Sequence, residues 1–396
     1  MRKLFLHIGC GKTGSSALQI WLAQNADRLE RSGVFYPRPN KKKLDNYAIT
    51  SGNAGALISK LNSVHDAEEL LISNLKSCEN NILYSSEGFQ NLDESQIVCL
   101  NSVAKKLELE IHIIAYMRDV YNYTYSSYMQ LIKRHSYSDT FSRFAYSQKI
   151  LQQFRVVNFF ESFFNNITVL HYDSEKEMGV EKAFCRVIGV KDEMVLPLAP
   201  YKVNRSLTLH ESQMLCAANL LYKNAFSNNA GEFCTVISDF IISVNPEAET
   251  EVYFDEGVVE YFTETMGEQI NHINKTFFGS DKLCVLGKSE TNYVTELPSL
   301  SDETFNFIHG LMKGMTVAFE SGLEVKVNPA PALLARDPRV ADILRKEAIK
   351  VEKSSIEDAY ILMSAAKIFR PAGPVITSKV NEYLELLQNT SNDGSN

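Results

Sequence analysis

A glycine-rich segment near the N-terminus has the composition of an anion-binding loop. It reads Gly-Cys-Gly-Lys-Thr-Gly-Ser-Ser from residue 9 and lies between an apolar run and an amphipathic stretch. Such loops direct successive backbone N–H groups toward one point, and the helix that follows adds the positive end of its dipole. The sequence therefore predicts an anion cradle formed by Cys10, Gly11, Lys12, Thr13, Gly14, Ser15 and Ser16.

The lysine of this segment is misplaced for a typical nucleoside-triphosphate loop. In the pattern G-x-x-x-x-G-K-[ST] the lysine directly follows the second glycine. Here Ser15 follows Gly14, and Lys12 stands two residues before that glycine. The spacing therefore disfavours ATP and GTP enzymes, although a nucleotide-dependent kinase stays open as an alternative.

A second pair of polar residues follows a later apolar run. Arg118 comes directly after Ile111–Met117, and Ser126 stands eight residues further on. Two turns of helix would bring both side chains to one face. Arginine is well suited to bind a phosphate through two parallel hydrogen bonds. The structural alternative is an ion pair of Arg118 with Asp119 or Glu87.

Two side chains near the loop could accept a proton from a hydroxyl group. Glu87 follows the apolar run Ile82–Tyr84, and His7 lies inside the first apolar run. A carboxylate or imidazole within hydrogen-bond reach can act as such a base. The alternatives are a helix cap or salt bridge for Glu87 and a core histidine for His7. Cys10 is either a thiolate favoured by Lys12 or simply a small turn residue.

The elements that must position these residues alternate between strand and helix over the first ~200 residues. In an open parallel sheet, ligands bind beyond the carboxyl ends of the strands, which is where the polar residues fall. We therefore predict an α/β, P-loop-like three-layer fold with a central, mostly parallel sheet. The predicted strands are Lys3–Ile8, Ile82–Tyr84, Ile111–Met117 and Ile167–His171, and the predicted helices between them include Ser15–Arg31, Asp66–Ser77, Asp93–Leu107, Val120–Arg134 and Ile150–Phe164.

Helical patterns dominate the second half of the chain. We predict one domain over 1–282, with a sheet core over 1–206 and a helical completion over 207–282. A C-terminal helical extension over 283–388 and a disordered tail over 389–396 follow. The predicted helices in this half are Glu211–Tyr222, Gly257–Phe277, Asp302–Glu320, Val340–Val351, Ile356–Ile368 and Ile376–Leu387.

Composition narrows the classes of protein further. The 396 residues are 45% apolar and 22% charged, which is typical of a globular protein. A net charge of −8 argues against a broad nucleic-acid or anionic-membrane surface. No apolar run reaches the ~18 residues that a membrane span needs. The seven cysteines include no C-x-x-C pair, which disfavours disulfides and zinc and favours the cytoplasm.

The loop resembles that of a known enzyme family. Lys12-Thr13-Gly14-Ser15-Ser16 is similar to the 5′-phosphosulfate loop of the sulfotransferases that use 3′-phosphoadenosine 5′-phosphosulfate (PAPS). That family binds the 3′-phosphate through an arginine after a later strand and a serine eight residues on, which Arg118 and Ser126 match. The flanks of the loop resemble the bacterial carbohydrate branch. The resemblance runs from residue 3 to about 280 and includes the segments 128–133, 169–172 and 204–207.

The resemblance implies a reaction and a set of roles. PAPS would donate its sulfuryl group in line, leaving adenosine 3′,5′-bisphosphate, without a metal ion because the transferred group carries a single charge. Lys12 would stabilise the leaving group, and Glu87 or else His7 would be the base. Arg205 would close over the 3′-phosphate, or else face solvent. The adenine would stack on one of four aromatic residues, namely Tyr123, Tyr125, Phe164 and Tyr172.

The acceptor is implied only by class. The carbohydrate branch suggests a hydroxyl of a sugar or glycan precursor, and oligomeric state is left open. The alternatives to this enzyme are the nucleotide-dependent kinase and a degenerate nucleotide-binding module without catalysis.

Overall fold

The structure is a computed structural model that describes residues 1–38, 52–76, 80–197, 205–225, 230–244, 246–287, 292–297, 338–353, 355–370 and 373–392. The chain divides into two compact units. Unit 1 consists of Met1–Ser126, Phe144–Val203 and Asp255–Glu290, and unit 2 of Ser127–Arg143, Asn204–Phe254 and Thr291–Asn396. The domain boundaries at 282 and 388 stay predictions.

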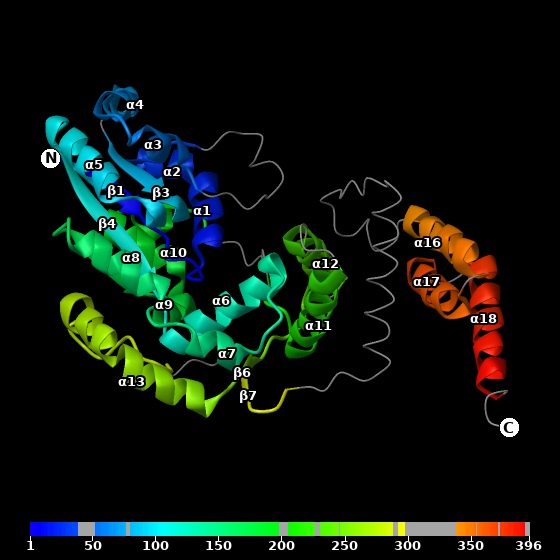
Figure 1. Cartoon of the computed structure of the whole chain (residues 1–396). Helices are drawn as coiled ribbons and strands as arrows, with labels where there is room; N and C mark the ends of the chain where they lie inside the picture. The colour runs from blue at the N-terminus through cyan, green and yellow to red at the C-terminus, as the bar shows by residue number, and fades with distance from the viewer. Residues whose placement is uncertain are drawn as a thin grey trace. The chain divides into compact units, whose positions relative to one another are not determined.

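Unit 1 is built on a parallel sheet (Figure 1). Within the described residues the sheet has five strands, and β1 pairs with β3 on one side and with β4 on the other. The register places His7 opposite Ser85 and Ile114. The predicted α/β class is confirmed. In spatial order the strands are β2 (Val34–Phe35), β3 (Asn81–Ser85), β1 (Arg2–His7), β4 (Leu109–Met117) and β5 (Ile167–His171).

Helices lie on both faces of this sheet (Figure 1), as is usual where every strand is parallel. On one face, Phe5, Leu83 and Ile114 pack against α1, α2 and α10 in one buried cluster. Helices α5 and α8 contact β4. The helices that lie wholly in unit 1 are α1 (Ser15–Gln24), α2 (Ala26–Arg31), α3 (Gly55–Lys60), α4 (Val64–Lys76), α5 (Glu94–Lys106), α8 (Gln152–Glu161), α9 (Tyr172–Met178), α10 (Val180–Ile188) and α13 (Glu256–Ile273).

Shorter helical turns complete unit 1. They are 3-10 turns at Glu87–Asn91 and Asp192–Met194 and a π-helical turn at Asn274–Phe278. Helices α6 (Val120–His135) and α7 (Phe141–Tyr146) each cross from one unit into the other.

The segment after the π-helical turn returns to the start of α6. The N–H groups of Val120 and Tyr121 donate to the carbonyls of Cys284 and Val285 at 3.1 and 2.9 Å. The N–H of Cys284 in turn donates to Asp119 Oδ1 at 2.9 Å. The first N–H groups of a helix have no partner within it, so this late segment satisfies two of them in α6.

Unit 2 is mainly helical. Beside its parts of α6 and α7 it contains α11 (Leu209–Ala225), α12 (Ala230–Val244) and a short parallel pair, β6 (Val252–Tyr253) with β7 (Tyr293–Val294). Three C-terminal helices follow: α16 (Pro338–Val351), α17 (Ile356–Phe369) and α18 (Pro374–Asn392). The predicted helix at 302–320 lies outside the described residues, and α18 continues into the predicted tail.

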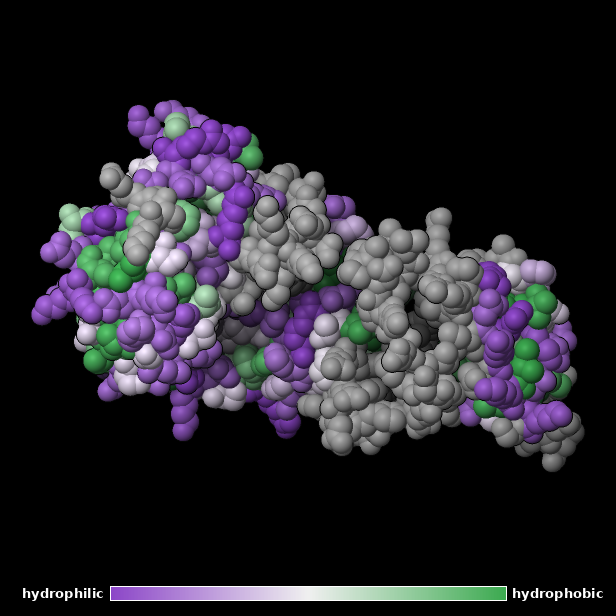
Figure 2. Space-filling model, turned by 90° about the horizontal axis from the view of Figure 1, so that it is seen from above, coloured by the Kyte–Doolittle hydropathy of each residue, from purple (hydrophilic) through white to green (hydrophobic). Residues whose placement is uncertain are grey.

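The three C-terminal helices share a core of their own. Small and apolar side chains fill it, and ion pairs join Arg370 to Asp342 and Lys379 to Glu352. Figure 2 shows hydrophilic and hydrophobic side chains interspersed on the outer surface of these helices. The core residues are Ala341, Leu344, Ala348, Ala359, Leu362, Met363, Ala365, Ala366, Ile376, Val380 and Tyr383.

Within the described part of the chain, no helix is both long and apolar enough to cross a membrane. None of the six cysteines in this part forms a disulfide.

Candidate functional site

The loop between β1 and α1 is held in an unusual backbone conformation. Gly9, Gly11 and Gly14 have φ angles of 34°, 62° and 73°, and Lys12 has a φ of 55°. A positive φ is easy for glycine but costs an ordinary L-residue about 1–2 kcal/mol. Strain of this kind persists where the surrounding structure enforces it, and it is concentrated at functional sites. The conformation at Lys12 therefore identifies this loop as a candidate functional site.

The carbonyl groups at the start of the loop are engaged by side chains. Gln90 Nε2 donates to the Gly9 carbonyl, and Tyr123 OH donates to the Cys10 carbonyl at 3.4 Å. The N–H groups of Cys10, Gly11, Thr13 and Gly14 donate to no acceptor that lies within the described residues. An anion seated on the loop would satisfy them.

Polar side chains at the loop are buried without partners. Thr13 and Gln19 are 1% and 2% exposed, yet Thr13 Oγ1 and Gln19 Nε2 have no hydrogen-bond partner among the described residues. Ser15 Oγ is buried as well, and it makes no bond of regular geometry although it lies close enough to Glu87 to lower the pKa of that carboxyl. A buried polar group without a partner is destabilising, and a ligand that bonded to Thr13 Oγ1 would remove that cost.

Glu87 faces this loop from the end of β3. A Cβ atom at Gly9 would lie 3.1 Å from Glu87 Cγ and 3.2 Å from Ser15 Oγ, so all three residues meet. Glu87 as a whole residue is exposed to solvent, while its surroundings partly desolvate the carboxyl. This desolvation raises the pKa of Glu87, and the charge of Lys12 and the Ser15 hydroxyl oppose the shift. The site thus sets a cation and a carboxyl of raised pKa beside each other.

His7 lies in the core rather than at the mouth of the loop. It is fully buried, its Nδ1 is 2.7 Å from Ser85 Oγ, and its ring makes edge contacts with Tyr116 and Phe184. Burial lowers the pKa of His7 to about 4, which makes it a weak base at neutral pH. The geometry favours the core-histidine alternative for His7, and the role of Glu87 as the base stays a prediction.

The surroundings of Cys10 disfavour a thiolate. Its side chain is fully buried, and burial together with the charge of Glu87 raises the pKa of the thiol to about 12. Its contribution to the loop is therefore its backbone.

Arg118 follows β4 and is held in place from two sides. Its Nε donates to Asp173 Oδ1 at 3.0 Å. Gln153 binds its backbone, accepting from the Arg118 N–H at 3.0 Å and donating to the Arg118 carbonyl at 2.9 Å. The ion pair predicted as an alternative therefore forms, although with Asp173 rather than with Asp119 or Glu87. Because only Nε is used, both terminal nitrogens of Arg118 stay without a partner among the described residues.

Tyr172 connects Arg118 to the loop. The guanidinium carbon of Arg118 lies 5.4 Å from the centre of the Tyr172 ring, a distance typical of a cation–π contact. A Cβ atom at Gly14 would lie 2.9 Å from Tyr172 Cε2, so only glycine allows this approach. The structure thus brings the loop, Glu87 and Arg118 into one neighbourhood at the carboxyl ends of the strands.

The remaining predicted residues lie in different settings. Ser126 and Ser16 are half-buried on α6 and α1. Arg205 belongs to unit 2, where its guanidinium pairs with both carboxyl oxygens of Glu211 at 2.7 and 2.8 Å. Its side chain is only 2% exposed, so the alternative of a solvent-facing cation is wrong. A role of Arg205 at the 3′-phosphate stays a prediction that this ion pair opposes.

The four aromatic residues predicted as candidates for stacking on adenine lie in different places relative to the loop. Phe164 lines a concavity with Asn81 and Leu109, the first residues of β3 and β4, and so lies at the opposite edge of the sheet from the loop. Tyr123 and Tyr125 are buried. Tyr172 adjoins both the loop and Arg118.

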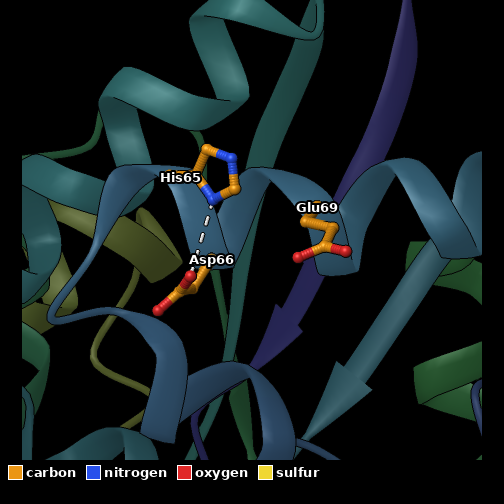
Figure 3. Close-up of side chains that lie close together, drawn as sticks. All are labelled: His65, Asp66 and Glu69. Carbon is orange, nitrogen blue, oxygen red and sulfur yellow. Dashed lines mark ion pairs between the residues drawn. The ribbon is translucent and has the colours of Figure 1, made fainter.

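Two groups of side chains in the described residues have a spacing that could suit a metal ion. His65, Asp66 and Glu69 are exposed on α4, where Figure 3 shows Glu69 one turn beyond the ion-paired His65 and Asp66. The other group consists of Asp119, His171 and Asp173. Its polar atoms already bond within the protein, because His171 Nε2 lies 3.1 Å from Asp119 Oδ1 and the Asp119 N–H donates to Asp173 Oδ2. Neither group points to a bound ion.

Sequence reasoning missed Gln153, Asp173 and Gln90, all of which orient the site. None of them stands at a telling distance from the motifs, since Gln153 and Asp173 meet Arg118 across 35 and 55 residues of chain. Of these three, only Asp173 could have been found from the sequence, because it closely follows the end of a predicted strand. Asp119 and Glu87 stand in the same way after the ends of two other predicted strands.

No family model matches the chain, and no curated protein sequence matches it. Among solved structures, a sulfotransferase from Alicyclobacillus acidocaldarius is similar to this chain with a TM-score of 0.31 and 13% sequence identity. The superposition covers 60% of this chain and 96% of that one. At this TM-score the similarity is too low to support a conclusion about function.

Proposed function

We propose that this protein transfers a sulfuryl group from PAPS to a hydroxyl group of an acceptor. The observation that carries the proposal is the set of unsatisfied donors at the β1–α1 loop, namely the free N–H groups and the buried Thr13 hydroxyl beside Lys12. They suit an anion that reaches the loop from outside the protein. The Tyr172 ring adjoins both the loop and Arg118, which supports a role of Arg118 in binding a second anionic group of the same molecule.

The residues fit a nucleotide that carries anionic groups at both its 5′ and 3′ positions. The loop offers backbone donors, hydroxyls and one ammonium group for a phosphosulfate. Arg118 offers two terminal nitrogens that Asp173 leaves unused, and a planar pair of N–H donors matches the oxygens of a phosphate. Asp173 fixes the plane of the guanidinium by holding Nε.

The chemistry then divides between two side chains. PAPS supplies a sulfuryl group already activated by its bond to a phosphate. Lys12 neutralises the charge that grows on the departing phosphate oxygen, which is the main way a protein can assist a loose in-line transfer. Glu87 accepts the proton of the attacking hydroxyl. Its raised pKa makes it a stronger base than an ordinary glutamate while it is ionised.

The acceptor and the setting follow from the resemblance of the loop and its flanks. We propose a sugar or glycan hydroxyl as acceptor and a cytoplasmic location, with no metal ion in the transfer step. A side chain at Gly11 would meet open space, so the structure leaves room on that side of the loop.

Calorimetric titration with adenosine 3′,5′-bisphosphate tests the proposal, with ATP plus Mg²⁺ as the comparison ligand. We expect micromolar binding of the bisphosphate without metal and, in Arg118→Ala, a loss of affinity of at least about tenfold. Binding of ATP with Mg²⁺ alone would indicate a kinase. Binding of neither would indicate a degenerate module.

A further inference from the structure

The pairing between β2 and β3 is interrupted by a proline. The register places Val34 opposite Asn81 and Phe35 opposite Ile82, so Pro37 falls opposite Tyr84. The Asn81 N–H donates to the Gly33 carbonyl, which fixes the phase of the ladder. In that phase residue 37 should donate its N–H to the Leu83 carbonyl and accept from the Ser85 N–H. Proline has no N–H, so the ladder cannot continue at this point.

The side chain of Asn53 takes the place of the missing ladder bonds. Its Nδ2 donates to the carbonyls of Leu83 at 3.1 Å and of Pro37 at 2.9 Å. Its Oδ1 accepts from the Ser85 N–H at 2.8 Å, and its own N–H donates to the Ser85 carbonyl at 3.0 Å. Asn53 is only 9% exposed. A primary amide is the smallest side chain that carries both donors and an acceptor, as this gap requires.

The backbone before Asn53 is shaped for the same contact. Gly52 has a φ of 84°, and a Cβ atom there would lie 1.8 Å from the Ser85 carbonyl oxygen. Only glycine permits both the angle and the approach. The chain is thus pressed against the last residue of β3 at this point.

The residues that Asn53 fixes lead directly into Glu87. Ser85 ends β3, and the Ser86 N–H donates to the His7 carbonyl at 3.1 Å on the β1 side. The end of β3 is therefore held by β1 on one side and by Asn53 on the other. The carboxyl of Glu87 lies two residues beyond Ser85.

We propose that Asn53 is a positioning residue that fixes the Ser85–Glu87 turn and so places the Glu87 carboxyl beside Lys12. This inference rests on the proposed function, in which Glu87 accepts the proton of the acceptor hydroxyl. It adds a residue that the resemblance does not indicate and that touches neither nucleotide nor acceptor.

The test compares Asn53→Ala with a matched control, Asn80→Ala. Asn80 also binds a main-chain carbonyl, that of Glu30, but it does so before the opposite end of β3. We expect Asn53→Ala to lower kcat by about tenfold or more and to move the acidic limb of the pH profile, because a base misplaced by about 1 Å is much less effective. The Kd for adenosine 3′,5′-bisphosphate should stay within about twofold, as should every value for Asn80→Ala.

Restoring the ladder gives a second readout. In Asn53→Ala/Pro37→Ala, residue 37 regains an N–H that can donate to the Leu83 carbonyl, so kcat should recover in part.

If Asn53→Ala fails to fold, the isosteric Asn53→Asp replaces it in the kinetic test. This variant keeps the volume of the side chain but loses both donors. Unchanged kcat and pH profile in Asn53→Ala and Asn53→Asp would overturn the inference.

Failure of the proposed function would be visible separately. The wild-type protein could fail both to bind the bisphosphate and to transfer a sulfuryl group. The positioning role of Asn53 can then still be tested through the titration of the Glu87 carboxyl, which carbon NMR follows. The signal of Glu87 is assigned by its absence in Glu87→Gln. A changed titration curve in the folded Asn53→Ala variant, which adds no charge near Glu87, would support the positioning role. An identical curve would contradict it.

Discussion

Lys12 combines the charge of the site with its backbone strain. Its φ of 55° is unfavourable for any residue with a side chain, so the loop is less stable than a glycine would make it. A strained residue at such a position indicates that its charged side chain is needed there despite the loss of stability. Activity and stability should therefore respond in opposite directions to substitution.

The first prediction compares two variants of this lysine. Lys12→Ala and Lys12→Gly should each lower the transfer rate by at least about 100-fold, because both remove the charge that stabilises the leaving group in the proposed function. Lys12→Gly should be the more stable of the two by up to about 1 kcal/mol, since glycine relieves the strain that alanine keeps. Activity assays and denaturant unfolding measure the two effects. A Lys12→Ala variant that keeps its rate would remove Lys12 from the mechanism.

The second prediction concerns pH and Glu87. Because burial raises the pKa of Glu87 in the folded protein, the transfer rate should rise with pH over a range above the ordinary pKa of a glutamate.

The same shift affects stability. Between the pKa of Glu87 in the unfolded protein and its raised pKa in the folded protein, the folded state binds more protons than the unfolded state, so stability falls as pH rises through that range. Glu87→Gln should therefore abolish transfer while matching or exceeding the wild-type melting temperature at neutral pH. Its bisphosphate affinity should be unchanged; a large loss would mean that Glu87 organises the loop instead.

At the scale of single elements, α1 depends on the glycine that precedes it. Gly14 caps the helix in the left-handed conformation, with a φ of 73° and no side-chain cap bond, and Tyr172 packs where its Cβ would be. The loop and α9 therefore share one contact, and the distance between the loop and Arg118 depends on it.

Gly14→Ala tests this dependence. We expect a loss of about 1–2 kcal/mol in unfolding free energy from the positive φ, together with weaker bisphosphate binding as Tyr172 is displaced. Gly33→Ala is the matched control, because Gly33 also has a positive φ of 90° but meets no atom within 4 Å. It should lose stability alone. Equal bisphosphate affinities in both variants would show that the Gly14–Tyr172 contact does not set the site.

Local patterns predicted the longer strands and the ends at which polar residues collect. They missed β2, which is two residues long and is followed by Pro37, because so short an edge strand has no periodicity to detect. They also merged α1 with α2. Asn25 separates these helices by donating to the Trp21 carbonyl and accepting from the Leu196 N–H, a partner 171 residues away that no local pattern can reveal.

The site was predictable to a similar degree. Residues in the loop and at strand ends follow from spacing, since the sheet brings strand ends together. Orienting residues such as Gln153 and Asn53 could not be predicted, because what they bind is decided by the tertiary fold. The ion pair of Arg205 is a different case, because its partner Glu211 is only six residues away and the spacing alone could have indicated the pair.

At the scale of the whole chain, the three C-terminal helices have a core made entirely within residues 341–383. Their tight packing relies on alanines, and Arg370 and Lys379 join neighbouring helices through ion pairs. A set of helices with its own core has what a small domain needs to fold.

A fragment spanning 338–392 should therefore fold by itself. We expect a helical circular dichroism spectrum and a cooperative thermal transition, and Met363→Ala should lower its midpoint because a fully buried side chain is lost. Leu386→Ala, at an exposed position, is the control and should change the midpoint little. A fragment without a cooperative transition would show that these helices need the rest of the chain.

The contacts within unit 1 determine when its site can be completed during synthesis on the ribosome. Asp119 and the first turn of α6 bond to Cys284 and Val285, and the Asp119–Cys284 bond spans 165 residues of chain. Contacts so distant in sequence form slowly and only after both partners exist. The turn that carries Arg118 therefore stays incomplete until residue 285 has been made. A nascent chain released before that residue would carry the loop without a finished second half of its site.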